Sequence, residues 1–306
     1  MVDVVPAADR LRAFAHNYWA VNLGFACAAV LAGLAGLAAE ASYLLLFLVD
    51  AGTTLIAAVV IATKVAESRP GWPALAAPGD EKRPRGPGDE KRPRDPGLRA
   101  VFSDRVFVCY LGLALLLAFV FMQNMSTLPV AVGHDRISPA RYGSVIALNG
   151  ILIVSGQLFV PRLLRGRDRT SVLAVAAAIV GVGFGLTAFA DTVPLYAVTV
   201  LIWTAGEMLN SPSHSALIAD LAPANLRGRY QGAFSLSWSV ASAGAPIIGG
   251  WVQQHLGDPA LWLGCGVIGM IVAVGNLIAG PARERRRAAL RSAELDYFWN
   301  VAQNAH

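Results

Sequence analysis

Charged residues are scarce in this sequence. Only 15% of its 306 residues are Asp, Glu, Lys or Arg, whereas an ordinary soluble domain has about 25%. They are also segregated, because long uncharged runs separate their clusters. A water-soluble globular protein needs charges spread over its surface, so the sequence excludes that class.

Cysteines and catalytic motifs are equally scarce. The three cysteines, Cys27, Cys109 and Cys265, all lie inside apolar runs, where no polar group accompanies them to form a metal site or a redox pair. This excludes a disulfide scaffold, and we expect no metal and no cofactor. The chain also lacks a zinc-protease motif, a phosphate-binding glycine loop and a nucleophile elbow. We therefore expect neither an enzyme nor an ATP-driven pump.

Long apolar runs are what the sequence does have. Hydrophobic residues make up 55% of it, and its mean hydropathy is +0.52. About 20 apolar residues in a helix cross the hydrocarbon core of a bilayer. The runs that reach this length are 19–39, 42–63, 107–132, 142–161, 170–190, 193–219, 230–254 and 259–281. They predict an all-α, polytopic membrane protein with eight transmembrane helices.

Basic residues predict the orientation of these helices. Of the 25 Lys and Arg side chains, 23 fall on one side of the predicted membrane, and only Arg136 and Arg141 fall on the other. Because basic loops stay in the cytoplasm, we expect a plasma-membrane protein with both termini cytoplasmic. The positive charge therefore indicates topology and contact with anionic lipid, and we expect no nucleic-acid partner.

A linker divides the chain. Within residues 67–105, PGDEKRPRG at 78–86 is followed at once by PGDEKRPRD at 87–95. Such dense proline, glycine and charge cannot bury a core, which predicts a solvated cytoplasmic linker. Before the linker we expect two helices of an N-terminal half at 1–66, and after it a six-helix half at 106–282. The basic tail at 283–306 is expected to lie as a helix on the membrane surface.

A second repeat relates the two sides of the linker. At a constant offset of 217, Asp3, Pro6, Ala7, Arg10 and Arg12 recur as Asp220, Pro223, Ala224, Arg227 and Arg229. Each set leads into a long apolar run, and two runs follow each set. The chain therefore looks like two related units, and the first has only its last two spans. We expect that four spans are missing ahead of Met1.

Several stretches resemble one transporter family. GEMLNSPSHSALIADLAPANLRGRYQG at 206–232, leading to GAPIIGG at 244–250, resembles helices 10 and 11 of bacterial drug-efflux members of the major facilitator superfamily. RAFAHNYWAVNLGFA at 12–26 and FMQNMSTLPVAV at 121–132 are similar to their helices 5 and 7. The resemblance implies helices 5 to 12 of a fold in which two six-helix halves rock about a central cavity.

The resemblance also implies a cytoplasmic gating loop, with one departure. The family signature G-x-x-x-D-R-x-G-R-R would start at Gly156, but Val160 stands at its acidic position and Pro161 follows. The gating residues implied by the resemblance are Arg162, Arg165, Arg167, Asp168, Arg169, Asp220, Arg227 and Arg229.

Two carboxylates are the only charges inside the predicted spans. Asp50 and Glu207 would each cost about 2.5–3.5 kcal/mol at the bilayer centre, so each is a candidate for proton coupling. Glu207 shares a helix face with Trp203, Asn210 and His214, which is typical of a cavity wall. Alternatively, Glu207 only hydrogen-bonds a neighbouring helix and orders the bundle.

Uncharged residues complete the candidate site. Substrate-cavity candidates are Trp203, Asn210, Gln123, Asn124, Asn149 and Trp238, and candidates for helix bending are Pro212, Gly244, Pro246, Gly249 and Gly250. Pro212 leaves the carbonyl of Met208 without its helical donor. The amides are equally suited to binding a ligand or another helix.

These patterns, together with the resemblance, give two functional hypotheses. The first is a secondary transporter that exports small amphipathic or cationic molecules and uses a proton gradient. Its partners would be the small-molecule substrate, protons and the lipid bilayer. The second is a truncated, transport-incompetent membrane protein with a structural or regulatory role at most. Its open face would be closed by a homodimer or by a separately encoded N-terminal fragment.

Overall fold

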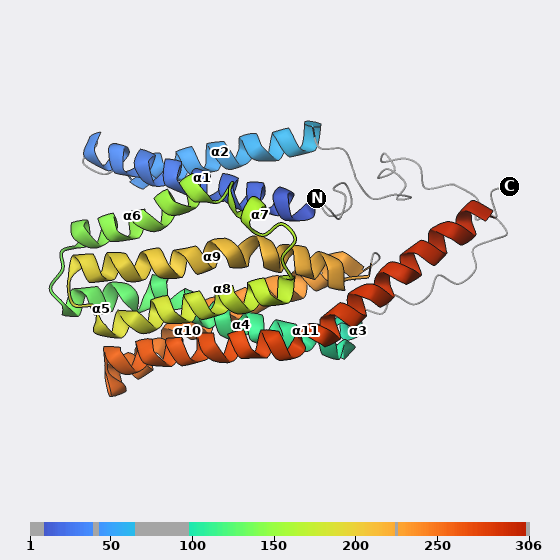
Figure 1. Cartoon of the computed structure of the whole chain (residues 1–306). Coiled ribbons are helices and arrows are strands. Elements are labelled where there is room, and N and C mark those ends of the chain that lie inside the picture. The colour runs from blue at the N-terminus through green and yellow to red at the C-terminus, as the bar shows by residue number, and fades with distance from the viewer. Residues whose placement is uncertain (1–8, 39–42, 65–97, 224–225, 304–306) are drawn as a thin grey trace.

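The computed structural model describes residues 9–38, 43–64, 98–223 and 226–303. Most of its long α-helices run roughly parallel to one another (Figure 1). In chain order the elements are α1 (Arg10–Ala38), α2 (Tyr43–Lys64), α3 (Arg99–Ser103), α4 (Arg105–Ser126), α5 (Leu128–His134), α6 (Pro139–Gly156), α7 (Val160–Leu163), α8 (Arg169–Leu186), the 3-10 helix η1 (Thr187–Phe189), α9 (Val193–Leu221), α10 (Arg227–Leu256) and α11 (Asp258–Gln303). The all-α prediction is confirmed for these residues.

Three helices in the described part of the chain are long and apolar enough to cross a membrane. They are Arg105–Ser126, Arg169–Phe189 and Asp258–Leu290. The other predicted runs also fall in helices, and two of these, Ala51–Thr63 and Arg141–Gly156, are apolar but shorter. The count of eight spans therefore stays a prediction.

Proline interrupts two of the predicted runs. The run 107–132 is divided at Thr127 between α4 and α5, and the run 142–161 is divided between α6 and α7. Both short helices carry a proline in their first turn, Pro129 in α5 and Pro161 in α7. Proline lacks a backbone N–H and is best tolerated at the start of a helix, so each one begins a new helix.

Aspartates start two of the long helices. The side chain of Asp104 accepts hydrogen bonds from the backbone N–H groups of Val106 and Phe107 at 3.1 and 3.2 Å, at the start of α4. Asp168 accepts from the N–H of Ser171 at 2.8 Å, at the start of α8. Both satisfy N–H groups that a helix leaves without partners.

The helices after α3 form a bundle around α8 and α9. α8 packs against α9 and α11, α4 packs against α10 and α11, and α6 packs against α9. Aromatic rings fill the interior, where Phe184 of α8 stacks on Trp203 of α9 and Trp262 of α11 at centroid distances of 5.4 and 6.3 Å. This apolar core holds the polar residues of α9 in fixed positions.

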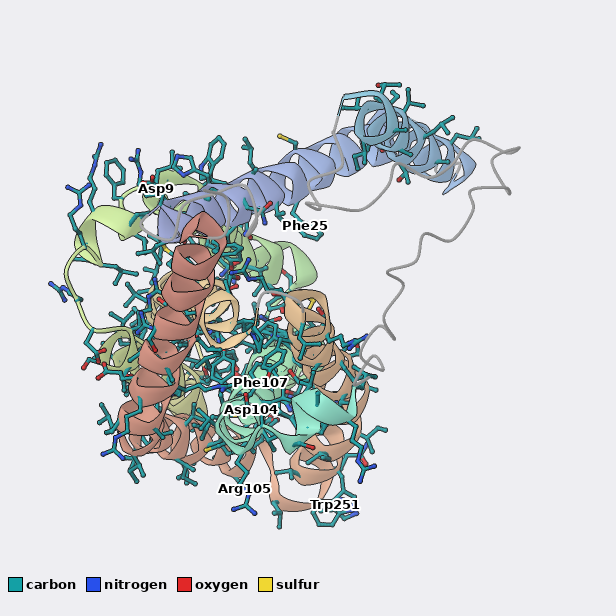
Figure 2. All side chains as sticks on the ribbon, turned by 90° about the vertical axis from the view of Figure 1, so that its right-hand side faces the viewer. Asp9, Phe25, Asp104, Arg105, Phe107 and Trp251 are labelled. Carbon is teal, nitrogen blue, oxygen red and sulfur yellow. The ribbon has the colours of Figure 1, made fainter. Side chains whose placement is uncertain are left out.

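α1 crosses one side of this bundle, and α2 lies beyond it, away from the other helices (Figure 1 and Figure 2). α1 packs against α6 and α9, whereas every side chain of α2 from 51 to 63 is exposed. Of the predicted linker 67–105, residues 67–97 lie outside the described residues. Outside them as well are Asp3, Pro6, Ala7 and Ala224 of the predicted repeat.

α11 extends beyond the last predicted span. The sequence predicts a span that ends at Pro281 and a separate surface tail from 283, but the helix continues through Pro281 to Gln303. The expected boundary between the six-helix half and the tail therefore falls inside one helix. Arg283, expected in the basic tail, is only 1% exposed. Its charge can be buried because its guanidinium finds hydrogen-bond acceptors on α11 itself, as described below.

Candidate functional site

Glu207 lies where three helices meet. From α9 its Oε1 accepts a hydrogen bond from the hydroxyl of Tyr18 in α1 at 2.6 Å. Its Oε2 accepts from Nδ2 of Asn149 in α6 at 2.9 Å, and the same nitrogen donates to Oγ1 of Thr204 at 3.0 Å. We call Tyr18, Asn149, Thr204 and Glu207 the Glu207 cluster. It joins α1 to the bundle.

Tyr18 was not among the residues predicted for the site. Its neighbour Trp19 donates from Nε1 to the carbonyl of Val154 in α6 at 2.8 Å, and Asn22 donates to the carbonyl of Tyr18 at 2.9 Å. Tyr18 directly precedes the predicted run 19–39, and the polar residues at 19 and 22 of that run were the available signal, because polar groups at membrane depth find partners. The sequence did not say which helix would supply those partners.

Pro212 lies inside α9 and has no backbone N–H to offer to the preceding turn. The carbonyl of Met208, four residues before Pro212 in α9, accepts a hydrogen bond from Nε2 of Gln157 at 3.3 Å. Gln157 follows α6 and is buried. Because proline has no N–H to donate to Met208, an amide from another element takes its place.

The other three residues on the Glu207 face of α9 each have different surroundings. Trp203 is 2% exposed and packs on Phe184 in the hydrophobic core, so its role in the substrate cavity stays a prediction. Asn210 is buried, and its Oδ1 has no hydrogen-bond partner among the described residues. His214 is also buried and pairs through Nδ1 with the hydroxyl of Tyr110 in α4.

Further candidates lie between α4 and α10. Gln123 donates from Nε2 to the carbonyl of Ala245 at 3.3 Å and accepts from the hydroxyl of Thr127 at 2.9 Å. Trp238 stacks on Phe121 at 6.1 Å between ring centroids. The carbonyl of Asn124 accepts from the Tyr142 hydroxyl at 3.4 Å. In this structure these groups hold helices together, and their role in binding substrate stays a prediction.

The glycines and the proline of α10 were expected to bend it. The helix is continuous through Pro246. A Cβ atom at Gly244 would lie 2.8 Å from Cζ of Phe119, and one at Gly249 would collide with the side chain of Gln123. The lack of a side chain at these two glycines therefore leaves room for Phe119 and Gln123 of α4. Gly250 has open space where its Cβ would lie. Helix bending stays a prediction for these residues.

Ion pairs connect part of the predicted gating loop. Arg169 donates to Oδ2 of Asp220 at the end of α9, and Arg287 of α11 approaches the same oxygen at 3.1 Å. Arg287 was not predicted to take part in this contact. Arg227 begins α10, and Arg229 follows in its first turn.

Asp168 is held as an anion. Burial acts to raise the pKa of its carboxyl, but hydrogen bonds from the backbone N–H and hydroxyl of Ser171 outweigh this and hold the pKa below its ordinary value. Asp168 therefore keeps its charge near neutral pH and serves as the cap of α8. The other acidic candidate, Asp50, belongs to α2, and its side chain lies outside the described residues.

Comparison with known proteins identifies the family. Residues 1–246 match the Major Facilitator Superfamily. The chain belongs to this superfamily. Curated proteins that it matches are named an MFS-type transporter and a multidrug resistance protein.

Two curated relatives illustrate the similarity. The uncharacterized MFS-type transporter YttB of Bacillus subtilis is 29% identical over 144 residues, which are 46% of this chain and 36% of YttB. The multidrug resistance protein MdtH of Salmonella newport is 30% identical over 183 residues, which are 57% of this chain and 44% of MdtH. This major facilitator chain thus spans less than half the length of either relative.

Proposed function

We propose that this major facilitator chain works in the proton-coupled export of small amphipathic or cationic molecules. Glu207 is the group that exchanges the proton. The observation that carries the proposal is the Glu207 carboxylate itself, bound by a hydroxyl from α1 and an amide from α6. The similarity to MdtH, which is named a multidrug resistance protein, supports the substrate class.

The cluster suits proton exchange because its hydrogen bonds depend on the charge of Glu207. An ionised carboxylate accepts hydrogen bonds on both oxygens, whereas a protonated carboxyl must donate from one of them. Proton uptake on Oε2 therefore breaks the contact to Asn149, whose NH2 group only donates, whereas uptake on Oε1 reverses the contact to Tyr18, whose hydroxyl can also accept. Uptake on Oε2 loosens α9 from α6, and this links protonation to helix arrangement.

A cationic substrate would compete with the proton at the same group. Both donors to Glu207 are uncharged, so no ion pair within the cluster neutralises the carboxylate. A cation that binds there compensates the cost of a charge at membrane depth. Substrate binding then favours proton release, and proton uptake favours substrate release.

Transport by reconstituted protein tests the proposal. The chain is placed in liposomes with an imposed pH gradient, and ethidium, a lipophilic cation, is the probe. We expect Glu207→Gln to reduce pH-driven ethidium movement to the level of protein-free liposomes, because the amide cannot exchange a proton. The Glu207→Gln protein should keep the elution profile and melting temperature of the parent chain.

A matched variant controls for the loss of one negative charge. Glu284→Gln removes an exposed carboxylate of α11 outside the Glu207 cluster, and we expect it to transport ethidium like the parent. Unchanged pH-driven transport by Glu207→Gln would remove Glu207 from the mechanism. Absence of transport by the parent chain itself would favour the transport-incompetent alternative for this polypeptide.

A further inference from the structure

A cavity of about 890 Å³ opens at the end of the bundle where α1, α4 and α8 begin. We call this end the basic end. The start of α1, the short helix α7 and the loop from α7 to α8 form the cavity wall. The charged residues that line it are Asp9, Arg12, Arg162, Arg165, Arg167 and Arg169. It is therefore built from both sides of the linker.

The charges of this cavity are strongly unbalanced. Five arginines line it beside a single carboxylate residue, Asp9, and of these five Arg169 is paired with Asp220. Of the nearby acids, Asp220 is engaged by Arg169 and Arg287, and Asp168 accepts its hydrogen bonds from Ser171. Arginine presents planar pairs of N–H groups that match the oxygens of phosphate. The cavity thus suits an anion with several oxygens.

Apolar side chains border the arginines. Phe159 and Leu158 line the same cavity, and Phe159 is 60% exposed. Leu163 of α7 is exposed beside them. An apolar part of an anion held by the arginines would lie against these exposed apolar side chains. Basic pockets between membrane helices bind lipid headgroups in this way.

We propose that this cavity binds the phosphate group of an amphiphilic anion, with the arginines of the α7–α8 loop around the phosphate. A phospholipid headgroup and a free phosphate share this chemistry, and the apolar border favours the lipid. The site is separate from the Glu207 cluster and does not depend on proton coupling. Because its wall includes α1 as well as α7, an occupied site holds the two parts of the chain together at the basic end.

Lipid binding by the purified full chain in detergent tests the proposal. The probes are phosphatidylglycerol, zwitterionic phosphatidylcholine and inorganic phosphate, with binding followed by native mass spectrometry and by thermal shift. The test variant is Arg162→Gln/Arg165→Gln/Arg167→Gln. The control is Arg99→Gln/Arg105→Gln/Arg285→Gln, which removes the same charge from exposed arginines outside the cavity. Figure 2 shows Arg105 at the edge opposite Asp9.

We expect phosphatidylglycerol to bind more tightly than phosphatidylcholine. The test variant should weaken phosphatidylglycerol binding by about 100-fold, since each of its three arginines near a lipid phosphate contributes roughly fivefold. The control variant should bind nearly as tightly as the parent. Equal losses in both triple variants, or equal binding of the two lipids, would overturn the proposal.

Two further arms complete the experiment. If inorganic phosphate displaces phosphatidylglycerol from the parent but not from the test variant, the site accepts free phosphate as well; if it does not displace the lipid, the headgroup is the ligand. Should the triple variant fail to fold, Arg165→Gln and Arg167→Gln are each expected to weaken lipid binding about fivefold. Unchanged binding by both single variants would contradict the proposed site.

Discussion

The guanidinium of Arg283 is buried at the contact between α11 and α4. Its Nη1 donates to Oδ1 of Asn276 at 3.0 Å, its Nε donates to the carbonyl of Ala279 at 3.3 Å, and Nη2 also donates to the carbonyl of Asn276. Its Cζ lies 6.0 Å from the centre of the Tyr110 ring. These acceptors and the aromatic ring replace water around a charge that would otherwise be costly to bury.

Removing one acceptor should therefore destabilise the protein. Asn276→Leu has a similar volume but leaves Nη1 of Arg283 without its side-chain acceptor. We expect a loss of about 1.5–3 kcal/mol, typical of a hydrogen bond to a charged group, measured as a lower thermal unfolding midpoint in detergent. The double variant Asn276→Leu/Arg283→Leu has no guanidinium left without an acceptor, so most of the lost free energy of unfolding should be restored. An unchanged midpoint for the single variant would contradict the prediction.

At the scale of the element, glycines set the distance between α8 and α11. A Cβ atom at Gly181 would lie 2.8 Å from Cα of Gly269, and one at Gly266 would lie 3.1 Å from Cα of Gly185. The two backbones touch directly, which is the usual way that membrane helices approach closely. The predicted special glycines were those of α10 instead, because a glycine in a sequence does not reveal which helix lies opposite.

Alanine at this contact should separate the two helices. Gly269→Ala places a methyl group against the backbone of α8, and we expect overpacking to cost about 1–3 kcal/mol. Gly264 of the same helix has nothing within 4 Å of its Cβ position. Gly264→Ala should therefore be neutral, or stabilising by up to about 1 kcal/mol through helix propensity. Equal unfolding midpoints for the two alanine variants would argue against the close contact.

At the scale of the whole molecule, the two ends of the bundle differ in charge. One end carries the arginine cavity, and the other carries Asp135, between α5 and α6, and Asp191, between η1 and α9. α1 begins and α11 ends toward the same end (Figure 1). Tyr196 donates to Oδ2 of Asp135 at 2.6 Å, and His134 approaches Asp258 at 2.8 Å, both away from the basic end. This division agrees with the separation of basic residues along the sequence and predicts which end faces the cytoplasm.

Cysteine labelling measures that orientation. After the three native cysteines are replaced by serine, single variants Arg167→Cys, Arg285→Cys and Asp191→Cys are treated with a membrane-impermeant maleimide on intact cells. We expect Asp191→Cys to react at once and the two basic-end variants to react only after lysis, because arginine-rich loops remain cytoplasmic. Labelling of Arg167→Cys and Asp191→Cys from the same side would contradict the topology.

The sequence by itself determined the helical class, the family and the chemistry of single positions. Charge scarcity and apolar length identified the helices, Glu207 stood out as a charge inside a span, and Pro212 identified a carbonyl in need of a donor. Each of these follows from local rules: a charge in an apolar run needs a partner, and a proline removes one specific hydrogen bond. Such rules need no knowledge of the neighbouring helix.

Only the tertiary structure decided which groups meet. It supplied Tyr18 as a partner of Glu207 and Gln157 as the donor to Met208, and it buried Arg283 in the bundle. Helical periodicity defines the faces of a helix but not which helix packs on each face. Those pairings depend on how closely backbones approach, and here contacts such as Gly181 with Gly269 decide it.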